Sequence, residues 1–366
     1  MPDMPKKILF LSNHYITLYA FRRELISQML SKGHQVYISA PADERNAYFE
    51  GIGCTMIDTP MSRRGMNPVE DMKLLGRYKE IMAELKPDII FSYTIKPNVY
   101  GTMASNALGF RQVCNITGTG ATFLKENFLS RLVRQLYRLS IKKCYKVFFQ
   151  NTGDRDYFIS HGLVKDNWAM LPGSGVNLSR HRFTELPDGE EIRFIYVGRV
   201  MAVKGIDEYL ECARAIREIL PNTRFYIAGF VEEDKYRQLI AHYESMGVVE
   251  YLGFQDNIDP WLRRCHCVIL PSLGGEGVPN VLLEAAATGR PCIASDINGS
   301  VDVVRDGVNG YIFKRGNADS LVEKVEKFMS LSYEQKCQMG LNGHEKVARE
   351  FDREIVISRY MEELEA

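Results

Sequence analysis

Short runs of apolar and β-branched residues alternate along the chain with amphipathic segments of helical period. In the first half, one helical pattern runs from Phe21 to Leu30 and ends at Gly33. The predicted strands of this half are residues 8–12 (ILFLS), 35–39 (QVYIS), 88–94 (DIIFSYT), 113–117 (VCNIT) and 146–151 (KVFFQN). Strand–helix alternation of this kind predicts a parallel sheet with helices on both faces.

A polar, irregular segment follows PGSGVN (172–177) and runs to about Glu191, where a second series begins. Its predicted strands are residues 192–198 (IRFIYVG), 224–229 (RFYIAG), 249–254 (VEYLGF), 267–272 (CVILPS) and 291–296 (PCIASD). We therefore expect two doubly wound, Rossmann-like α/β domains, residues 1–172 and 173–349, with a cleft between them. The C-terminal segment, residues 350–366, is expected to form a helix that returns to the first domain.

Composition fits a globular, cytoplasmic protein. The chain has 366 residues, of which 45% are hydrophobic and 25% charged, and no run of 18 apolar residues suggests a membrane-spanning helix. The eight cysteines form no CxxC pair, which favours reduced, buried thiols. Residues 1–175 hold 23 Lys and Arg against 15 Asp and Glu, so the rest hold 46 − 23 = 23 against 46 − 15 = 31. This surplus of +8 in the first part indicates that it faces an anionic partner.

Two basic residues follow a predicted strand end in the second half. In VGRVMAVKG, Arg199 lies just past the strand and Lys204 five residues later, before a glycine and a helix. Ligands of open parallel sheets bind beyond the carboxyl ends of strands. A guanidinium and an ammonium at this position suit a diphosphate, although two solvated loop cations would give the same pattern.

A glycine-rich turn and a helix follow the strand CVILPS. In GGEGVPNVLLEAAATGRP, Glu276 lies in the turn, Pro279 suits the first helical position, and Glu284 lies in the second turn of the helix. The helix N-terminus would face an anion, Glu276 could accept hydrogen bonds from hydroxyls, and Glu284 could reach a vicinal diol. Either glutamate alone is better explained as a solvated surface residue.

The order GRxxxxKG followed by two glutamates with seven residues between them resembles the family 4 retaining glycosyltransferases, which have the GT-B fold. Five further segments are similar to the bacterial branch that acts on polyprenyl-diphosphate-linked sugars, including the N-acetylgalactosaminyl and galacturonosyl transferases. These are residues 91–105, 115–123, 147–163, 171–178 and 290–313.

The resemblance implies an enzyme that transfers a hexose-type sugar, possibly an N-acetylhexosamine or uronic acid, from a nucleotide donor to a polyprenyl-diphosphate-linked saccharide. It implies a UDP-linked donor, retention by a front-face mechanism, surface-glycan or glycoprotein-glycan assembly, and no cofactor or nucleic acid. Residues 173–349 would bind the donor and residues 1–172 the acceptor.

The resemblance also assigns roles to single residues. Arg199 and Lys204 would hold the diphosphate, Glu276 would bind the sugar and support the oxocarbenium-like state, and Glu284 would bind the ribose. The other expected donor contacts are Gly198, Phe254, Gln255, Gly277, Val278, Pro279 and Asn280, with Gly118 and Gly120 from the first domain. His14 and Lys96 are candidates for the acceptor side. The first loop, SNHYITLYAF, departs from the family in lacking a glycine pair, and ITGTG lacks a histidine.

The tripeptide DRD, residues 154–156, matches the DxD metal motif of another glycosyltransferase fold. It lies at an expected helix start, where acidic residues are favoured in any case. We therefore interpret Asp154 and Asp156 as structural and expect no essential metal ion.

A basic amphipathic segment spans residues 124–146, with seven basic residues and one acidic residue. Such a helix can bind an anionic membrane surface through Arg131, Arg134, Arg138 and Lys142, or it can be an ordinary domain helix with solvated charges. The first interpretation places the protein peripherally on the inner leaflet of the plasma membrane.

Two other functions remain open. A UDP-sugar epimerase of the GT-B type would also need carboxylates and diphosphate contacts, and would interconvert sugars without an acceptor. A non-catalytic nucleotide-sugar-binding subunit is the other alternative, although both glutamates and both cations are present.

Overall fold

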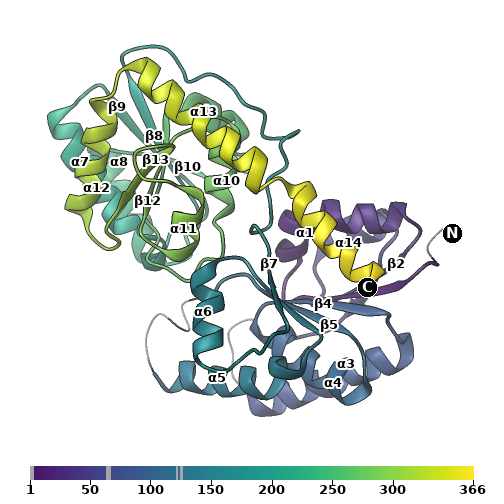
Figure 1. Cartoon of the computed structure of the whole chain (residues 1–366). Helices are drawn as coiled ribbons and strands as arrows, with labels where there is room; N and C mark the ends of the chain where they lie inside the picture. The colour runs from purple at the N-terminus through teal and green to yellow at the C-terminus, as the bar shows by residue number, and fades with distance from the viewer. Residues whose placement is uncertain (1–3, 63–66, 121–122, 124–126) are drawn as a thin grey trace. The chain divides into compact units, whose positions relative to one another are not determined.

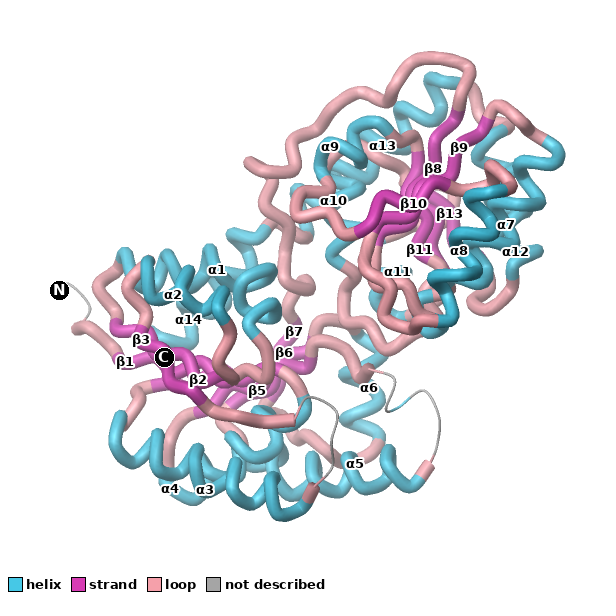
Figure 2. Tube along the Cα trace, turned by 180° about the vertical axis from the view of Figure 1, so that it is seen from behind, coloured by secondary structure: helices cyan, strands magenta, loops and turns pink. Residues whose placement is uncertain are grey.

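The computed structural model describes residues 4–62, 67–120, 123 and 127–366. It divides into two compact units: residues 1–174 with 354–366, and residues 175–353. The described residues of each unit form an α/β structure around one parallel sheet (Figures 1 and 2). The predicted pair of doubly wound domains is therefore confirmed as a fold class.

The first unit contains a seven-stranded sheet in the order β3-β2-β1-β4-β5-β6-β7. Its strands are β1 (Lys7–Leu11), β2 (Gln35–Ala40), β3 (Thr55–Asp58), β4 (Ile89–Tyr93), β5 (Gln112–Ile116), β6 (Lys146–Phe149) and β7 (Trp168–Met170). All its paired strands run parallel. The strand order reverses between β1 and β4, and a doubly wound sheet binds its ligands at such a switch point.

Helices cover both faces of this sheet. They are α1 (Tyr15–Ser31), η1 (Glu44–Asn46), α2 (Ala47–Gly51), α3 (Pro68–Leu85), η2 (Pro97–Gly101), α4 (Thr102–Leu108), α5 (Phe128–Ser140), η4 (Ile141–Lys143), α6 (Thr152–Ser160) and α14 (Arg353–Glu365). One core contains buried residues of α1, α2 and α14, and the other contains those of α3, α4, α5 and α6. Figures 1 and 2 agree in placing α1 and α14 together on one face of the sheet.

Three expectations from the sequence need correction in this unit. Helix α1 begins at Tyr15 rather than Phe21, because the His14 side chain caps it by accepting a hydrogen bond from the Ile16 amide at 3.1 Å. Strands β3 and β7 were not predicted, since they are short and their side chains are only partly buried or exposed. The basic helix expected over 124–146 ends at Ser140, and residues 124–126 of it lie outside the described residues, as do 121–122 of the segment 115–123.

The C-terminal helix α14 is held on the first unit by a buried polar cluster. The Tyr360 hydroxyl hydrogen-bonds to Asn115 and to Tyr93, and the Arg22 guanidinium lies over both tyrosine rings, at 5.1 and 5.5 Å. At the end of the helix, Glu363 pairs with Lys146 at 2.5 Å. These polar contacts fix the position of α14 on the first unit in addition to its apolar packing.

The second unit contains a six-stranded parallel sheet in the order β10-β9-β8-β11-β12-β13. Its strands are β8 (Ile192–Val197), β9 (Thr223–Ala228), β10 (Glu250–Gly253), β11 (Cys267–Leu270), β12 (Cys292–Ser295) and β13 (Gly310–Phe313). The last strand was not predicted, because GYIF is short and follows a glycine-rich turn. The order reverses between β8 and β11, so the switch point of this sheet lies there.

Helices also cover both faces of the second sheet. They are η5 (Ala202–Lys204), α7 (Ile206–Ile219), α8 (Lys235–Ser245), α9 (Asp259–Arg264), α10 (Asn280–Ala287), α11 (Asn298–Val303), α12 (Ala318–Met329) and α13 (Tyr333–Glu350). Buried residues of α7, α8 and α12 form one core, and those of α9, α10 and α11 form the other. All eight cysteines of the chain are free thiols, and seven are buried. Within the described part of the chain, no helix is long and apolar enough to cross a membrane.

Candidate active site

The two sequence motifs of the second unit meet at its switch point. The loop that carries Arg199 and Lys204 leaves the carboxyl end of β8, and the loop that carries Glu276 leaves the carboxyl end of the neighbouring strand β11. The pairing of β8 with β11 therefore places residues far apart in the sequence at the same edge of the sheet. Parallel sheets of this type bind ligands at that position.

Lys204 and Glu276 form an ion pair across the switch point. The Lys204 Nζ lies 2.6 Å from Glu276 Oε1, and the side chains are 18% and 16% exposed. The sequence pointed to both residues but not to their contact. The pair puts one cation and one carboxylate at a single, largely buried point.

Glycines allow the two loops to approach each other closely. Gly205 has a φ of 73°, and a Cβ at this position would overlap the carbonyl oxygen of Pro271. A Cβ at Gly299, in α11, would overlap the carbonyl oxygen of Gly277. The Lys204 loop is thus held against the β11 exit, and the Gly277 turn is held against α11.

Arg199 lies on the same β8 exit but has a looser partner. Its Nη1 lies 3.8 Å from Glu232 Oε1, and its side chain is 39% exposed. The Arg199 backbone is fixed more firmly, since its carbonyl oxygen accepts a hydrogen bond from the buried Tyr196 hydroxyl at 2.7 Å. A guanidinium with this exposure can turn toward an incoming anion.

Helix α10 begins at Asn280, one residue later than the sequence suggested. Pro279 was expected at the first helical position, but its ψ of 116° is extended and it is the N-cap residue. Its carbonyl oxygen accepts the amides of Leu282 and Leu283, at 3.1 and 3.4 Å. The helix N-terminus, preceded by Gly277 and the buried Val278, therefore follows directly on the turn that carries Glu276.

Glu284 lies in the second turn of α10, in a desolvated environment. The pKa of Glu284 is raised to about 7, chiefly because the carboxyl group is buried; Arg180 and Arg353 oppose this rise and Asp259 adds to it. A carboxyl group with this pKa changes its charge near neutral pH. In its ionised form both carboxylate oxygens accept hydrogen bonds, whereas in its protonated form one of them carries an O–H donor.

The expected base-reading residues follow β10. Phe254 is 61% exposed, so its ring is available to a ligand. The Gln255 side chain is engaged locally: its Nε2 donates to the Leu252 carbonyl at 2.6 Å and its Oε1 accepts from Trp261 at 3.3 Å. The backbone of this segment is consequently fixed by its own side chain. Gly198 directly follows β8, where the loop of Arg199 begins.

The candidate residues of the first unit follow strand β5 or precede helices α1 and η2. Gly118 and Gly120 follow β5, and both have positive φ values, 114° and 63°. His14 is the N-cap of α1, so its Nδ1 serves the helix. Lys96 precedes η2 and pairs with Asp71, at 2.7 Å between Nζ and Oδ1.

Asp154 contacts the residue that caps helix α6, and Asp156 forms an ion pair with its neighbour in the sequence. Asn151 caps α6 by accepting the Asp154 amide at 2.7 Å, and its own amide donates to the Asp154 carboxylate at 2.9 Å. Asp156 is paired with Arg155. Among the residues that the structure describes, no group of three or more His, Cys, Asp and Glu side chains could hold a metal ion.

Helix α5 has both a buried and an exposed apolar side. Val133 and Tyr137 are buried in the core, whereas Phe128 and Leu139 are 79% and 69% exposed. Arg131 and Arg138 are exposed, Arg134 contacts Tyr157, and Lys142 lies in the following η4 turn.

Sequence reasoning missed Asp71, Tyr100 and Glu232, which are the partners of candidate residues. Asp71 accepts a hydrogen bond from Tyr100 at 2.9 Å as well as the Lys96 ion pair. No local motif marks these residues. The early position of Asp71 in a helix is where any acidic residue is favoured.

Comparisons with known families match both halves of the chain. Residues 7–151 match the family described as Glycosyl transferase 4-like, and residues 179–346 match Glycosyl transferases group 1. Over 97% of both chains, the sequence is 25% identical to N,N'-diacetylbacillosaminyl-diphospho-undecaprenol alpha-1,3-N-acetylgalactosaminyltransferase of Campylobacter jejuni. It is 24% identical to an Escherichia coli UDP-Gal:alpha-D-GlcNAc-diphosphoundecaprenol alpha-1,3-galactosyltransferase, over 77% of this chain and 79% of that protein.

The fold is shared with solved structures. The Anabaena protein Alr3699/HepE, in complex with UDP-glucose, superposes with a TM-score of 0.81 at 17% identity over 98% of this chain and 99% of its own. At this level of sequence identity, the likeness shows a shared fold and nothing about activity.

Proposed function

The chain is a family 4 glycosyltransferase with the GT-B fold, and we propose that it transfers a hexose-type sugar from a UDP-linked donor to a polyprenyl-diphosphate-linked saccharide with retention. The observation that carries the proposal is the meeting of Lys204 and Glu276 at the switch point of the second sheet, 2.6 Å apart. Two relatives, the Campylobacter jejuni and Escherichia coli transferases, are named for undecaprenol-diphosphate-linked sugars, which supports the acceptor class.

The geometry suits a nucleotide sugar whose diphosphate enters the switch point. An ammonium has three N–H donors, so Lys204 can hold a phosphate oxygen while it remains near Glu276. Arg199 can add a forked contact, and the first amides of α10 can meet the same charge. Glu276, still near Lys204, can also accept hydrogen bonds from sugar hydroxyls beside the diphosphate.

The proposed reaction breaks the bond between sugar C1 and the diphosphate oxygen, and forms a bond between C1 and an acceptor hydroxyl on the same face. The acceptor proton passes to the departing phosphate oxygen. Arg199 and Lys204 stabilise the negative charge that develops on this leaving group, and Glu276 stabilises the positive charge on the sugar. Glu284, when ionised, holds the ribose hydroxyls.

A donor screen tests the proposal. Purified protein is incubated with UDP-linked glucose, galactose, N-acetylhexosamines and uronic acids, together with a short-chain prenyl-diphosphate monosaccharide. We expect one sugar to be transferred, with an α-linkage by NMR if the donor is α-linked. An inverted linkage would refute retention, and sugar interconversion without acceptor would favour an epimerase.

The acceptor class leads to a proposal on location, namely that the protein works at the inner face of the plasma membrane, with α5 against the anionic surface. Exposed Phe128 and Leu139 could enter the interface, and Arg131 and Arg138 lie exposed between them in the sequence. Each basic residue near an anionic surface contributes about 1 kcal/mol.

Vesicle binding tests this location. Replacement of Arg131, Arg134, Arg138 and Lys142 by glutamine should weaken binding to vesicles with anionic lipid, and binding of the natural chain should fall as salt rises. A control with glutamine at the exposed Lys32 and Lys79 removes charge elsewhere in the first unit. Equal losses in the two proteins would mean that the attraction is general and α5 has no special part.

A further inference from the structure

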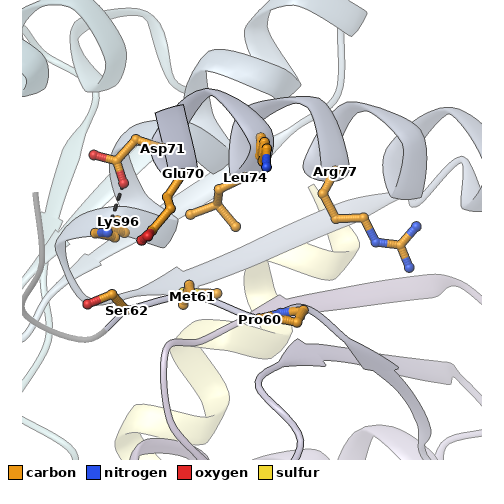
Figure 3. Close-up of a pocket in the computed structure, with 9 residues that line it drawn as sticks. Pro60, Met61, Ser62, Glu70, Asp71, Leu74, Arg77 and Lys96 are labelled. Atoms are coloured by element: carbon orange, nitrogen blue, oxygen red, sulfur yellow. Dashed lines mark ion pairs between the residues drawn. The ribbon is translucent and has the colours of Figure 1, made fainter. Parts of the chain in front are cut away.

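A pocket lies at the carboxyl edge of the first sheet, and none of its described lining residues is among those expected to bind the donor. It has a volume of about 530 Å3, which is within the range of small-molecule sites. Its walls are the loop after β3, one face of α3 and Lys96, which follows β4 (Figure 3). The lining residues are Pro60, Met61, Ser62, Glu70, Asp71, Lys73, Leu74, Arg77 and Lys96.

The inner end of the pocket is built around the fixed pair of Lys96 and Asp71. Both side chains are 13% exposed, and the two oxygens of Asp71 are taken by Lys96 at 2.7 Å and by Tyr100 at 2.9 Å. Asp71 is thus neutralised and held in place. The ammonium of Lys96 has three N–H donors, so its pair with Asp71 leaves capacity for a ligand.

Basic residues also mark the mouth of the pocket. Lys73 and Arg77 lie one turn apart on α3, both exposed, and Arg77 has a loose contact with Glu80 at 3.6 Å. The lining holds three basic and two acidic residues, and the Lys96–Asp71 pair removes one of each, which leaves Lys73 and Arg77 against Glu70. The electrostatics therefore favour an anion, and a guanidinium favours a phosphate in particular.

The remaining walls suit a sugar attached to that anion. Figure 3 shows the Glu70 carboxylate and Ser62 at the same end as Lys96, with Arg77 at the other end. Glu70 and Ser62 can accept hydrogen bonds from hydroxyls, while Met61, Leu74 and Pro60 offer apolar surface to the C–H face of a ring. None of the nine described lining residues is aromatic, so none of these nine could stack on a nucleotide base.

We propose that this pocket binds the sugar–phosphate head of the lipid-linked acceptor. Arg77 and Lys73 hold the phosphate at one end, and Glu70, Ser62 and Lys96, which is fixed by Asp71, bind sugar hydroxyls at the other end (Figure 3). The identity of this ligand as the acceptor rests on the proposed function. The alternative source of a sugar phosphate is the nucleotide donor.

Two probes distinguish these sources by calorimetry, without turnover: a short-chain prenyl-diphosphate N-acetylhexosamine and a UDP-sugar. Arg77→Gln should lower the affinity for the prenyl probe about tenfold or more, which is the usual loss for one charge-assisted contact. The affinity for the UDP-sugar should not change. Lys79→Gln is the matched control, since it removes an exposed charge two residues away on α3 that does not line the pocket. It should bind both probes normally.

A second variant, Ser62→Trp, fills the pocket without changing its charge. It should weaken the prenyl probe and keep UDP-sugar affinity, with thermal melts reporting the fold of each variant. Equal affinity of R77Q and K79Q for the prenyl probe would overturn the proposal, even if transfer occurs. Loss of UDP-sugar binding in R77Q would assign the pocket to the donor. Normal probe results without any transfer would leave the pocket in place and refute the proposed function.

Discussion

Each unit holds a lysine–carboxylate pair beyond the carboxyl edge of its sheet, and the two pairs differ in what holds the carboxylate. Lys96 and Asp71 are 2.7 Å apart in the first unit, and Lys204 and Glu276 are 2.6 Å apart in the second. All four side chains are less than one-fifth exposed. In both cases the lysine follows a strand that borders the switch point, β4 or β8.

The carboxylates have different supports. Asp71 lies on an 18-residue helix and also accepts a hydrogen bond from Tyr100. Glu276 lies in a turn next to Gly275, whose φ is 77°. A carboxylate on a long helix is held by the helix backbone, whereas the backbone of a glycine turn can change its conformation more readily when a ligand contacts the lysine. The same kind of ion pair can therefore brace a pocket in one unit and, in the other unit, lie where a substrate can share its lysine.

The largest expected effect is on donor binding. Lys204→Ala or Arg199→Ala should weaken UDP-sugar binding by about tenfold to a hundredfold or more, because each charge-assisted contact to phosphate contributes about 1.5–3 kcal/mol. Calorimetry with UDP measures this loss. Arg214→Ala, on α7 and paired with Glu218 at the surface, is the control and should bind normally. Unchanged donor affinity in both site variants would refute the diphosphate assignment.

The next prediction separates the two carboxylates. Asp71→Asn should lower the free energy of unfolding by about 1–3 kcal/mol, because it leaves Lys96 without its counter-charge in a largely buried position. Glu276→Gln should keep more of its stability and lose transfer activity. Thermal melts and rates are measured for both, with the exposed Asp166→Asn as control. A larger stability loss in E276Q than in D71N would reverse the proposed roles.

The pH dependence of donor binding tests whether Glu284, the other candidate carboxylate of the second unit, binds the ribose. If only ionised Glu284 binds the ribose, a pKa of about 7 means that affinity for UDP should fall about tenfold between pH 8 and pH 6. Glu284→Gln should bind more weakly at pH 8 and lose most of this dependence. A wild-type affinity that does not change between these pH values would contradict the assignment.

The raised pKa of Glu284 also predicts how the free energy of unfolding depends on pH. The pKa of Glu284 rises on folding from its ordinary value of 4.5 to about 7, so the unfolded chain binds fewer protons between these pH values. Its contribution to stability is therefore full below about pH 4.5 and is lost as pH rises to about 7. Denaturation of E284Q at pH 8 should accordingly show a protein at least as stable as the natural chain, although it binds donor less well.

Much of the fold could be predicted from the sequence, because the central strands are buried, β-branched runs such as DIIFSYT and CVILPS. Strands β3, β7 and β13 were missed, since three or four residues carry little periodicity, and the side chains of β3 and β7 are also partly exposed. The start of α1 was missed for a different reason: its cap is a histidine, which is not among the usual N-cap residues.

The site was only partly predictable. Arg199, Lys204, Glu276 and Glu284 lie in recognisable local motifs, but the contact between Lys204 and Glu276 depends on the pairing of β8 with β11. The first-unit pocket combines pieces from residues 60–62, 70–77 and 96. Its residues have no shared motif, so only the folded chain brings them together. This explains why Lys96 alone was singled out and its partner Asp71 was not.

The smallest expected effect is that of metal chelation. If lysine and arginine supply the positive charge at both phosphate sites, transfer should continue at nearly the same rate in EDTA, because Arg199, Lys204 and the N-terminus of α10 already stabilise the departing diphosphate. Asp154, from the DRD tripeptide, is engaged in the cap of α6 with Asn151. Asp154→Asn should consequently affect thermal stability more than the response to added Mg²⁺ or Mn²⁺. The measurement is the initial rate with saturating donor in EDTA, and again after each ion is restored. If chelation abolishes activity and one of these ions restores it, the prediction of a metal-independent reaction is wrong. The positive charge at the donor site would then come from the metal as well as from the side chains.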